Sequence, residues 1–164
     1  MELSEKLEEL LSGDTVVVCT GNTLRGDDGV GVLIGRRLLE LGYRVFVYED
    51  GLENHLGEIG RLKPSRVLVI DAVEAGLEPG GVVLARAEDT SAVLVSTHKL
   101  PLRVISRILR ELYGVEETWL LGVQVKSVEF GSEVSAEVLE AADVIVGLFA
   151  KFRREGVEKT LGKQ

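Results

Sequence analysis

The sequence predicts an α/β fold with three layers, in which a mostly parallel, twisted sheet of about five strands is flanked by helices on both faces. Two observations carry this prediction. Continuous aliphatic and β-branched runs are typical of strands buried on both faces, and they occur at TVVVCT (15–20), RVLVID (66–71) and TWLLGVQV (118–125). Segments with apolar residues at helical spacing alternate with these runs, as expected for βαβ units.

The elements are expected to form a single domain over residues 1–164. Leucines at helical spacing predict a short helix over 4–11, ended by Gly13. After the first strand, GVLIGRRLLELG predicts a helix that ends at Gly42. The remaining patterns predict strands at 43–48 and 82–85 (the latter at an edge), short helices at 54–62 and 90–95, a helix at 102–112 and a long helix from 135 past 149. Residues 2–11 precede the motif region, and 156–164 are expected to form a flexible tail.

The charge and cysteine content exclude several classes of function. Twenty-seven acidic residues against nineteen basic ones give a net charge of −8, which opposes binding to nucleic acid or anionic lipid. The sequence shows neither a signal peptide nor an apolar stretch of the about 20 residues that span a bilayer. Cys19 is the single cysteine, which excludes an intrachain disulfide and a cysteine-based zinc cage. We therefore expect a cytoplasmic, monomeric protein without membrane insertion.

Acidic residues follow the predicted strands at the points where ligands bind in open α/β sheets. The first strand leads to Asp27 and Asp28, and the third ends in Asp71. The second strand leads to Glu49 and Asp50, so all these acids are expected at one edge of the sheet. His98 precedes a predicted helix, and its loop returns to that edge if the preceding strand is parallel. Two carboxylates and an imidazole suit a mononuclear metal site, with the metal left open.

Each of these residues also has a simpler interpretation. Asp27 or Asp28 could cap the helix that begins near Gly29, because Asp is favoured at helix N-caps. Asp71 could be structural, and His98 could be a surface or hydrogen-bonding residue. Two further side chains are expected to take no part in chemistry: His55 at the surface and Cys19 in the core.

The glycine-rich loop after the first strand does not match a phosphate-binding motif. Gly21, Gly26, Gly29 and Gly31 fit neither G-x-G-x-x-G nor a P-loop, and no Lys-Ser/Thr pair follows. An acidic pair within the loop would also repel phosphate. The glycines are better explained by close backbone approach to a metal or a partner chain.

Four blocks of the sequence resemble the [NiFe]-hydrogenase maturation endopeptidases. GNTLRGDDGVG (21–31) is similar to the family signature G-N-x-x-x-x-D-[DE]-x-x-G, and VIDAVEAGLEPGGV (69–82), STHKLPL (96–102) and LGVQVKSVEFG (121–131) are similar to its later blocks. The resemblance runs in order over residues 14–150. The G-D-D form of the first block, ENHLGEI at 53–59 and the THxxPL form of the third resemble the branch that serves hydrogenase 3 of the formate hydrogenlyase system and related membrane-bound hydrogenases.

The resemblance implies a specific activity. Such endopeptidases remove a C-terminal extension from the hydrogenase large-subunit precursor after nickel has been inserted. By motif position, Asp28, Asp71 and His98 are the implied catalytic residues and the residues that contact nickel. The nickel is expected to arrive with the large subunit, so the free enzyme is expected to be metal-free. Gly21, Asn22, Asp27 and Gly31 are assigned supporting roles: Asp27 would cap or orient, and Gly31 would permit close packing.

Some questions stay open at this point. EDGLENHLGE replaces the Gly-Gly or Gly-Thr loop of many family members, which leaves the substrate-contacting loop undetermined. An aspartic-type and a metal-assisted mechanism are both compatible with the residues. A non-catalytic maturation chaperone that binds the nickel-loaded large subunit is the alternative function, and a small nucleotide-binding protein is a third.

Overall fold

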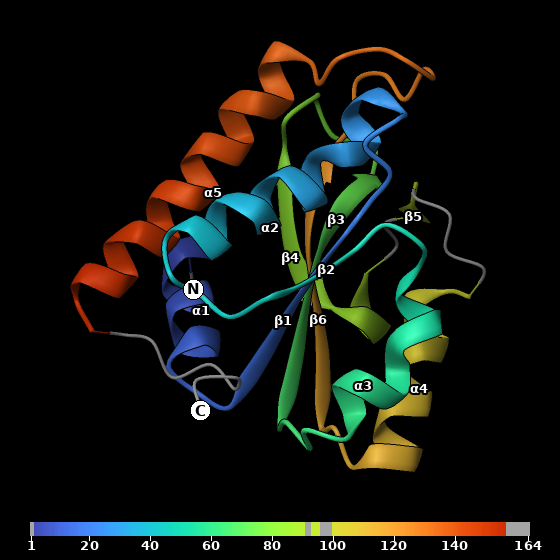
Figure 1. The fold of residues 1–164 in the computed structure, drawn as a ribbon, viewed down its shortest axis with the longest axis vertical. Coiled ribbons are helices and arrows are strands. Elements are labelled where there is room, and N and C mark those ends of the chain that lie inside the picture. Colours follow the sequence, from blue (N-terminus) through green and yellow to red (C-terminus); the bar gives the residue numbers. More distant parts are fainter. Residues whose placement is uncertain (1, 91–92, 96–99, 157–164) are drawn as a thin grey trace.

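The computed structural model describes residues 2–90, 93–95 and 100–156 (Figure 1). The helices are α1 (Leu3–Leu11), α2 (Val30–Glu40), α3 (Leu56–Gly60), α4 (Leu102–Tyr113) and α5 (Ala136–Arg154). The strands are β1 (Thr15–Thr20), β2 (Phe46–Tyr48), β3 (Arg66–Glu74), β4 (Val82–Arg86), β5 (Val93–Leu94) and β6 (Glu117–Gln124). Three short 3-10 turns are η1 (Gly26–Gly29), η2 (Leu52–His55) and η3 (Ala87–Asp89).

The strands form one sheet in the order β2-β1-β3-β6-β4. The first four are parallel, whereas β4 runs antiparallel along β6 at the edge, where the sequence predicted an edge strand. β5 pairs antiparallel with the last residues of β3. β1 is buried along its whole length, as its unbroken β-branched sequence predicted. The mostly parallel α/β architecture is therefore confirmed.

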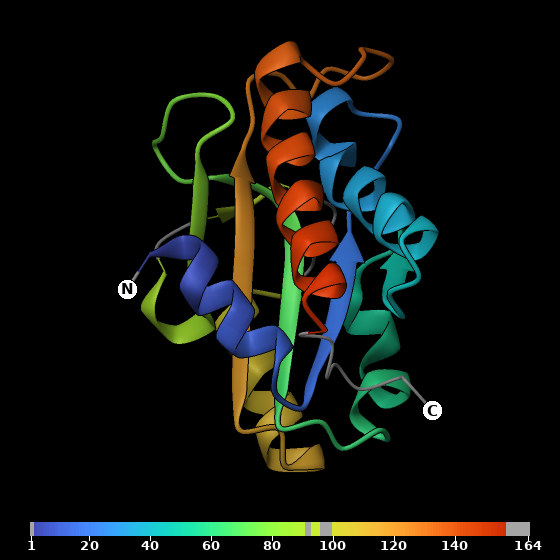
Figure 2. The same ribbon diagram turned by 90° about the vertical axis from the view of Figure 1, so that its left-hand side faces the viewer.

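Helices cover both faces of the sheet, and each face has its own core. Figure 2 views the sheet through α1, α2 and α5, and Figure 1 shows α3 and α4 on the opposite face. Alternate residues of β1 divide between the two cores, with Val17 and Cys19 packing on the first side and Val16 and Val18 on the second. Of the helices in the described residues, none combines the length and apolarity needed to cross a membrane.

The start of α2 lies unusually close to the sheet because glycine occupies the contact points. A Cβ at Gly35 would lie 2.7 Å from Cys19 Cβ, and one at Gly31 would lie 2.1 Å from the Thr20 carbonyl oxygen. No side chain fits at either position without moving the helix. The close-packing role predicted for Gly31 thus agrees with the geometry, and it brings the loop before α2 against the strand ends.

The helix predicted at 90–95 is wrong for the part of that segment that the structure describes. β3 continues past Asp71 to Glu74, so its last residues offer a free edge, and Val93 and Leu94 pair with it as β5. A sequence window of six residues contains no information about this partner.

Two other segments also differ from prediction, because tertiary contacts outweigh local propensity. The strand predicted at 43–48 is restricted to β2, and the buried Tyr43 instead packs edge-on against Phe149 and donates its hydroxyl to the Phe149 carbonyl at 2.7 Å. The helix predicted at 54–62 is divided between η2 and α3.

Two predicted chain features concern the end of α2 and the C-terminal tail. Gly42, at φ 94°, follows the end of α2 in the left-handed conformation expected there. Residues 157–164 of the expected tail lie outside the described residues.

Candidate functional site

The carboxyl ends of β1 and β3 place Thr20 beside Asp71. The two strands are parallel with Cys19 opposite Ile70, so the next residue of each strand occupies the same level of the sheet. The Thr20 hydroxyl donates a hydrogen bond to Asp71 Oδ2 at 2.7 Å, and the Ala72 N–H donates to Asp71 Oδ1 at 2.7 Å. Both side chains are buried. The Asp71 carboxylate is therefore held in one orientation before any substrate arrives.

Asp28 reaches the same edge of the sheet from the loop after β1. It lies in η1, which contacts β3, and its side chain is fully buried. Three residues later, a Cβ at Gly31 would lie 3.2 Å from Asp71 Cα, which shows how closely the η1–α2 segment approaches the end of β3. The structure thus brings Asp28 and Asp71 to one edge, and their roles as ligands stay a prediction.

Arg25 links Asp28 to the end of β5. Its Nη1 donates to Asp28 Oδ2 at 3.3 Å and to the Val95 carbonyl at 3.3 Å, while about a third of the side chain (32%) stays exposed. The Val95 N–H in turn donates to the Ala72 carbonyl at 3.4 Å. Val95 therefore lies next to both the loop that carries Asp28 and Ala72, the residue after Asp71.

His98, the third predicted site residue, lies outside the described residues. By topology, the His98 loop was expected at this edge if the preceding strand is parallel, and that condition is not met. The antiparallel β5 precedes it instead, paired with the extension of β3 beyond Asp71. Within the described part of the chain, no group of three or more His, Cys, Asp and Glu side chains is placed to hold a metal ion.

Asp27 binds the segment that follows β6. Its Oδ2 accepts hydrogen bonds from the Lys126 N–H (2.7 Å), the Ser127 N–H (3.0 Å) and the Ser135 hydroxyl (2.9 Å), and its Oδ1 accepts one from the Ser135 N–H (2.7 Å). Burial raises the pKa of this carboxyl, but these hydrogen bonds outweigh it and hold the pKa below its ordinary value. Because Ser135 is the N-cap residue of α5, Asp27 ties the loop bearing Asp28 to the start of that helix.

The simpler interpretation of Asp27 and Asp28 as N-caps is not supported. Neither η1 nor α2 has a side-chain capping hydrogen bond, and α2 begins after Gly29. Asp27 instead bonds to partners that lie about a hundred positions away in the sequence, which explains why no local pattern identified them.

Glu49 and Asp50 lie at the exposed end of β2 and bind neighbouring side chains. Glu49 accepts a hydrogen bond from the Thr23 hydroxyl at 2.8 Å and forms an ion pair with Arg36 at 3.1 Å. Asp50 pairs with His55 Nε2 at 2.7 Å. The His55 ring, expected to be a surface residue, is 26% exposed and stacks on Tyr48 with ring centroids 3.7 Å apart. These residues stabilise the loop after β2.

Two residues that the sequence reasoning missed, Thr20 and Arg25, contact the predicted ligands. Thr20 could have been found, because the last residue of β1 must lie beside the Asp that ends the RVLVID run in a parallel neighbour. Arg25 lies three positions before Asp28, a spacing that permits an ion pair within one turn. Cys19 is buried as expected, and burial raises the pKa of its thiol far above its ordinary value.

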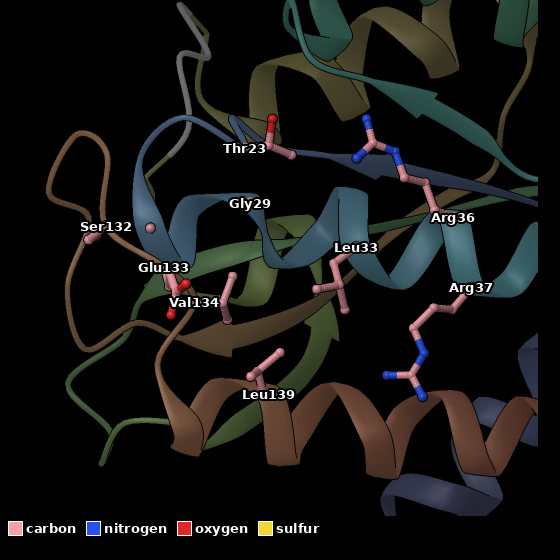
Figure 3. Close-up of a pocket in the computed structure, with 10 residues that line it drawn as sticks. Thr23, Gly29, Leu33, Arg36, Arg37, Ser132, Glu133, Val134 and Leu139 are labelled. Carbon is pink, nitrogen blue, oxygen red and sulfur yellow. The ribbon is translucent and has the colours of Figure 1, made fainter.

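A separate groove of about 580 Å³ lies between α2 and α5, closed at one end by Ser132–Val134 (Figure 3). Leu33, Val134 and Leu139 provide its apolar lining. Arg36 and Arg37 of α2 also line it, and Figure 3 shows Arg37 pointing toward α5 and Arg36 pointing to the other side of α2. Gly26 and Gly29 line it as well, so it adjoins η1. Neither Asp28 nor Asp71 contributes to its lining.

Comparison with known proteins identifies the family. A family model described as HycI, hydrogenase maturation protease, matches residues 51–151. The hydrogenase 3 maturation protease of Escherichia coli K12 is 31% identical over 134 residues, which cover 79% of this chain and 85% of that protein. The crystal structure of the [NiFe] hydrogenase maturation protease HycI from Thermococcus kodakarensis is 33% identical, with a TM-score of 0.78 over 91% of this chain and 99% of that one.

The solution structure of the endopeptidase HycI from Escherichia coli gives a TM-score of 0.72 at 26% identity, over 85% of this chain and 91% of that one. The matches extend over most of this chain and most of each relative. The chain therefore belongs to the hydrogenase maturation protease family and is a peptidase.

Proposed function

We propose that this peptidase removes the C-terminal extension of a [NiFe]-hydrogenase large-subunit precursor after nickel insertion, and that it recognises the bound nickel through Asp28, Asp71 and His98. The observation that carries the proposal is the meeting of two buried carboxylates, Asp28 and Asp71, at the carboxyl edge of the sheet. Both carboxylates are held at that edge by neighbouring donors, Asp71 by Thr20 and the Ala72 N–H and Asp28 by Arg25. The names of the relatives support the substrate, since they include a hydrogenase 3 maturation protease.

The position of Val95 supports the inclusion of His98. His98 is the third residue after Val95, and an extended chain covers at most about 10 Å over that length. Val95 is bonded to the Ala72 carbonyl and to Arg25, which is itself bonded to Asp28. We propose that this short connection brings the His98 imidazole to the two carboxylates.

The donor set suits nickel that arrives with its protein substrate. Imidazole is a good ligand for nickel, and two carboxylates add oxygen donors that can complete the coordination of an ion already held by the precursor. We propose that the free enzyme is metal-free and that nickel binding positions the scissile peptide at the edge of the sheet. Positioning of this kind orients the scissile peptide relative to the catalytic groups before reaction. Such orientation supplies a large part of the rate enhancement of many enzymes.

Hydrolysis then needs an activated water rather than a protein nucleophile. Cys19 is buried in β1 with a raised thiol pKa, so it is a poor nucleophile. Asp28 and Asp71 are acceptors that can hold a water and take its proton, and the nickel ion can polarise the scissile carbonyl. In this proposal Asp28 and Asp71 serve both as nickel ligands and as the general base. We propose that the reaction takes place in the cytoplasm.

Mass spectrometry of a nickel-loaded large-subunit precursor tests the proposal. The wild-type chain is expected to produce a large subunit shortened at its C-terminus, and nickel-free precursor is expected to keep its full mass. If the chain binds the loaded precursor and leaves its mass unchanged, the non-catalytic chaperone is the correct function. If both precursors are shortened at equal rates, nickel recognition is excluded.

A further inference from the structure

Arg25 places a permanent positive charge against the Asp28 carboxylate. Its backbone is held at both ends, because the Arg25 N–H donates to the Asn22 carbonyl at 3.2 Å and the Asp28 N–H donates to the Arg25 carbonyl at 3.1 Å. Its side chain ends between Asp28 Oδ2 and the Val95 carbonyl, with Nη1 3.3 Å from each. The guanidinium is therefore positioned beside Asp28 by contacts on two different segments.

A metal ion and this guanidinium compete for the same carboxylate. A divalent transition-metal ion binds a carboxylate oxygen at about 2.1 Å, so an ion on Asp28 Oδ2 would lie within about 6 Å of Arg25 Nη1 if the arginine kept its place. Arginine cannot lose its charge to relieve the repulsion. An ion that binds through Asp28 Oδ2 in place of the guanidinium displaces Arg25 from both Asp28 and the Val95 carbonyl, and an ion on Oδ1 is still repelled by the fixed positive charge beside it. Free metal must provide the free energy for this exchange through its bonds to the enzyme alone.

We propose that Arg25 is a specificity-determining residue that makes Asp28 accept nickel carried by a docked protein substrate and refuse free divalent ions. This inference rests on the proposed function, because it takes Asp28 as a nickel ligand. Nickel that arrives on a docked precursor binds as an intramolecular step at a high effective concentration, and the protein–protein contacts contribute to displacing the arginine. Free nickel has neither advantage. The enzyme thus stays metal-free until the loaded precursor docks.

Isothermal titration calorimetry with NiCl₂ alone measures this competition directly. Arg25→Gln and Arg25→Met remove the charge, and the second keeps an apolar stem in case the first melts at the assay temperature. Both are expected to bind Ni²⁺ at least about tenfold more tightly than the wild type. Arg25→Lys keeps a charge and is expected to stay within about threefold of the wild type. Arg36→Gln is the matched control, because it breaks an exposed ion pair with Glu49 and is expected to leave the affinity unchanged.

Two further measurements assign the effect. The double variant Arg25→Gln/Asp28→Asn is expected to lose the gained affinity, and a gain that survives this change would place the ion elsewhere and overturn the proposal. In the precursor-cleavage assay, added NiCl₂ is expected to inhibit Arg25→Gln at concentrations that leave the wild type unaffected.

The inference and the proposed function fail in different ways. If neutral variants bind Ni²⁺ no more tightly than the wild type while the wild type still shortens nickel-loaded precursor, the role of Arg25 is wrong and the function stands. If the wild type does not shorten the precursor, the proposed function is wrong, and the inference falls with it.

Discussion

The Thr20 hydroxyl lies 2.7 Å from Asp71 Oδ2 and joins the carboxyl ends of two neighbouring parallel strands. Both residues are fully enclosed, so the hydroxyl replaces water as a donor to a buried carboxylate. A buried carboxylate that loses a donor bears a desolvation cost that exposed groups avoid. This hydrogen bond therefore contributes both to the stability of the sheet and to the orientation of a predicted ligand.

Thr20→Val keeps the shape of the side chain and removes the donor. We expect it to lower the free energy of unfolding by about 1.5–3 kcal/mol, because the acceptor is a buried carboxylate. Urea denaturation followed by circular dichroism measures this change. Thr118→Val is the matched control in β6: the Thr118 hydroxyl is buried, and no partner for it exists among the described residues. That control is expected to be neutral or stabilising, and an equal loss in both variants would contradict the assignment.

Asp27→Asn tests the attachment of the η1 loop to the segment after β6. In the wild type, the Lys126 N–H donates to Asp27 Oδ2 and the Ser135 N–H donates to Asp27 Oδ1. In either orientation of the asparagine amide, its NH₂ group therefore faces an N–H donor and loses one of these hydrogen bonds. We expect a loss of about 1.5–3 kcal/mol in the free energy of unfolding, with a parallel loss of precursor cleavage. Asp143→Asn removes an exposed ion pair with Arg37 and is expected to cost less than about 1 kcal/mol. If Asp27→Asn is as mild as this control, the four hydrogen bonds do not hold the loop.

The Cys19 thiol is expected to resist alkylation in the folded protein. The Cys19 side chain faces α2 from β1 and is buried there, and burial raises the pKa of its thiol. Little thiolate is therefore available near neutral pH. Iodoacetamide at pH 8, followed by intact-mass analysis, should leave the native chain unmodified and add one adduct in 6 M guanidinium chloride. Rapid alkylation of the native chain would show that Cys19 is accessible and would reopen it as a nucleophile.

Glu88 gives the fold a modest dependence on acid. Burial raises the pKa of this carboxyl, but the hydrogen bond from Arg110 at 2.7 Å and the charges of Arg110 and Arg86 hold the pKa below its ordinary value near 4.5. Because the folded pKa is the lower one, the stabilisation is complete above about pH 4.5 and is lost as the pH falls through the folded pKa. The difference in melting temperature between the wild type and Glu88→Gln should therefore shrink from pH 7 to pH 3. A constant difference would show that the ion pair does not couple η3 to α4.

The fold could be predicted because its central strands occur in the sequence as unbroken aliphatic and β-branched runs. RVLVID and TWLLGVQV are buried on both faces, so they need no alternation, and the helices between them carry a clear apolar stripe. The segment at 90–95 could not be predicted in this way. Its conformation depends on the length of β3, because Val93 pairs with Glu74 only where that strand extends beyond its neighbour β1.

The site could be predicted in part for a related reason. Asp28 follows β1, and Asp71 lies in the parallel strand β3 one residue beyond its last pairing with β1, so topology brings both to one edge. The role of Asp27 depends on Ser127 and Ser135, a hundred or more residues along the chain, and no local motif indicates such partners. The placement of His98 stays a prediction, since that residue lies outside the described residues.

Cleavage of nickel-loaded precursor by single-site variants tests the central claim most directly. Asp28→Asn, Asp71→Asn and His98→Ala should each remain folded by circular dichroism and lose at least about 100-fold in cleavage rate, because loss of residues that merely support a metal ligand already costs about 10–100-fold. Asp50→Asn, at the same edge but paired with His55, should cleave at the wild-type rate. Wild-type rates for any of the first three variants would contradict the account, because a ligand that can be removed without effect does not hold the nickel.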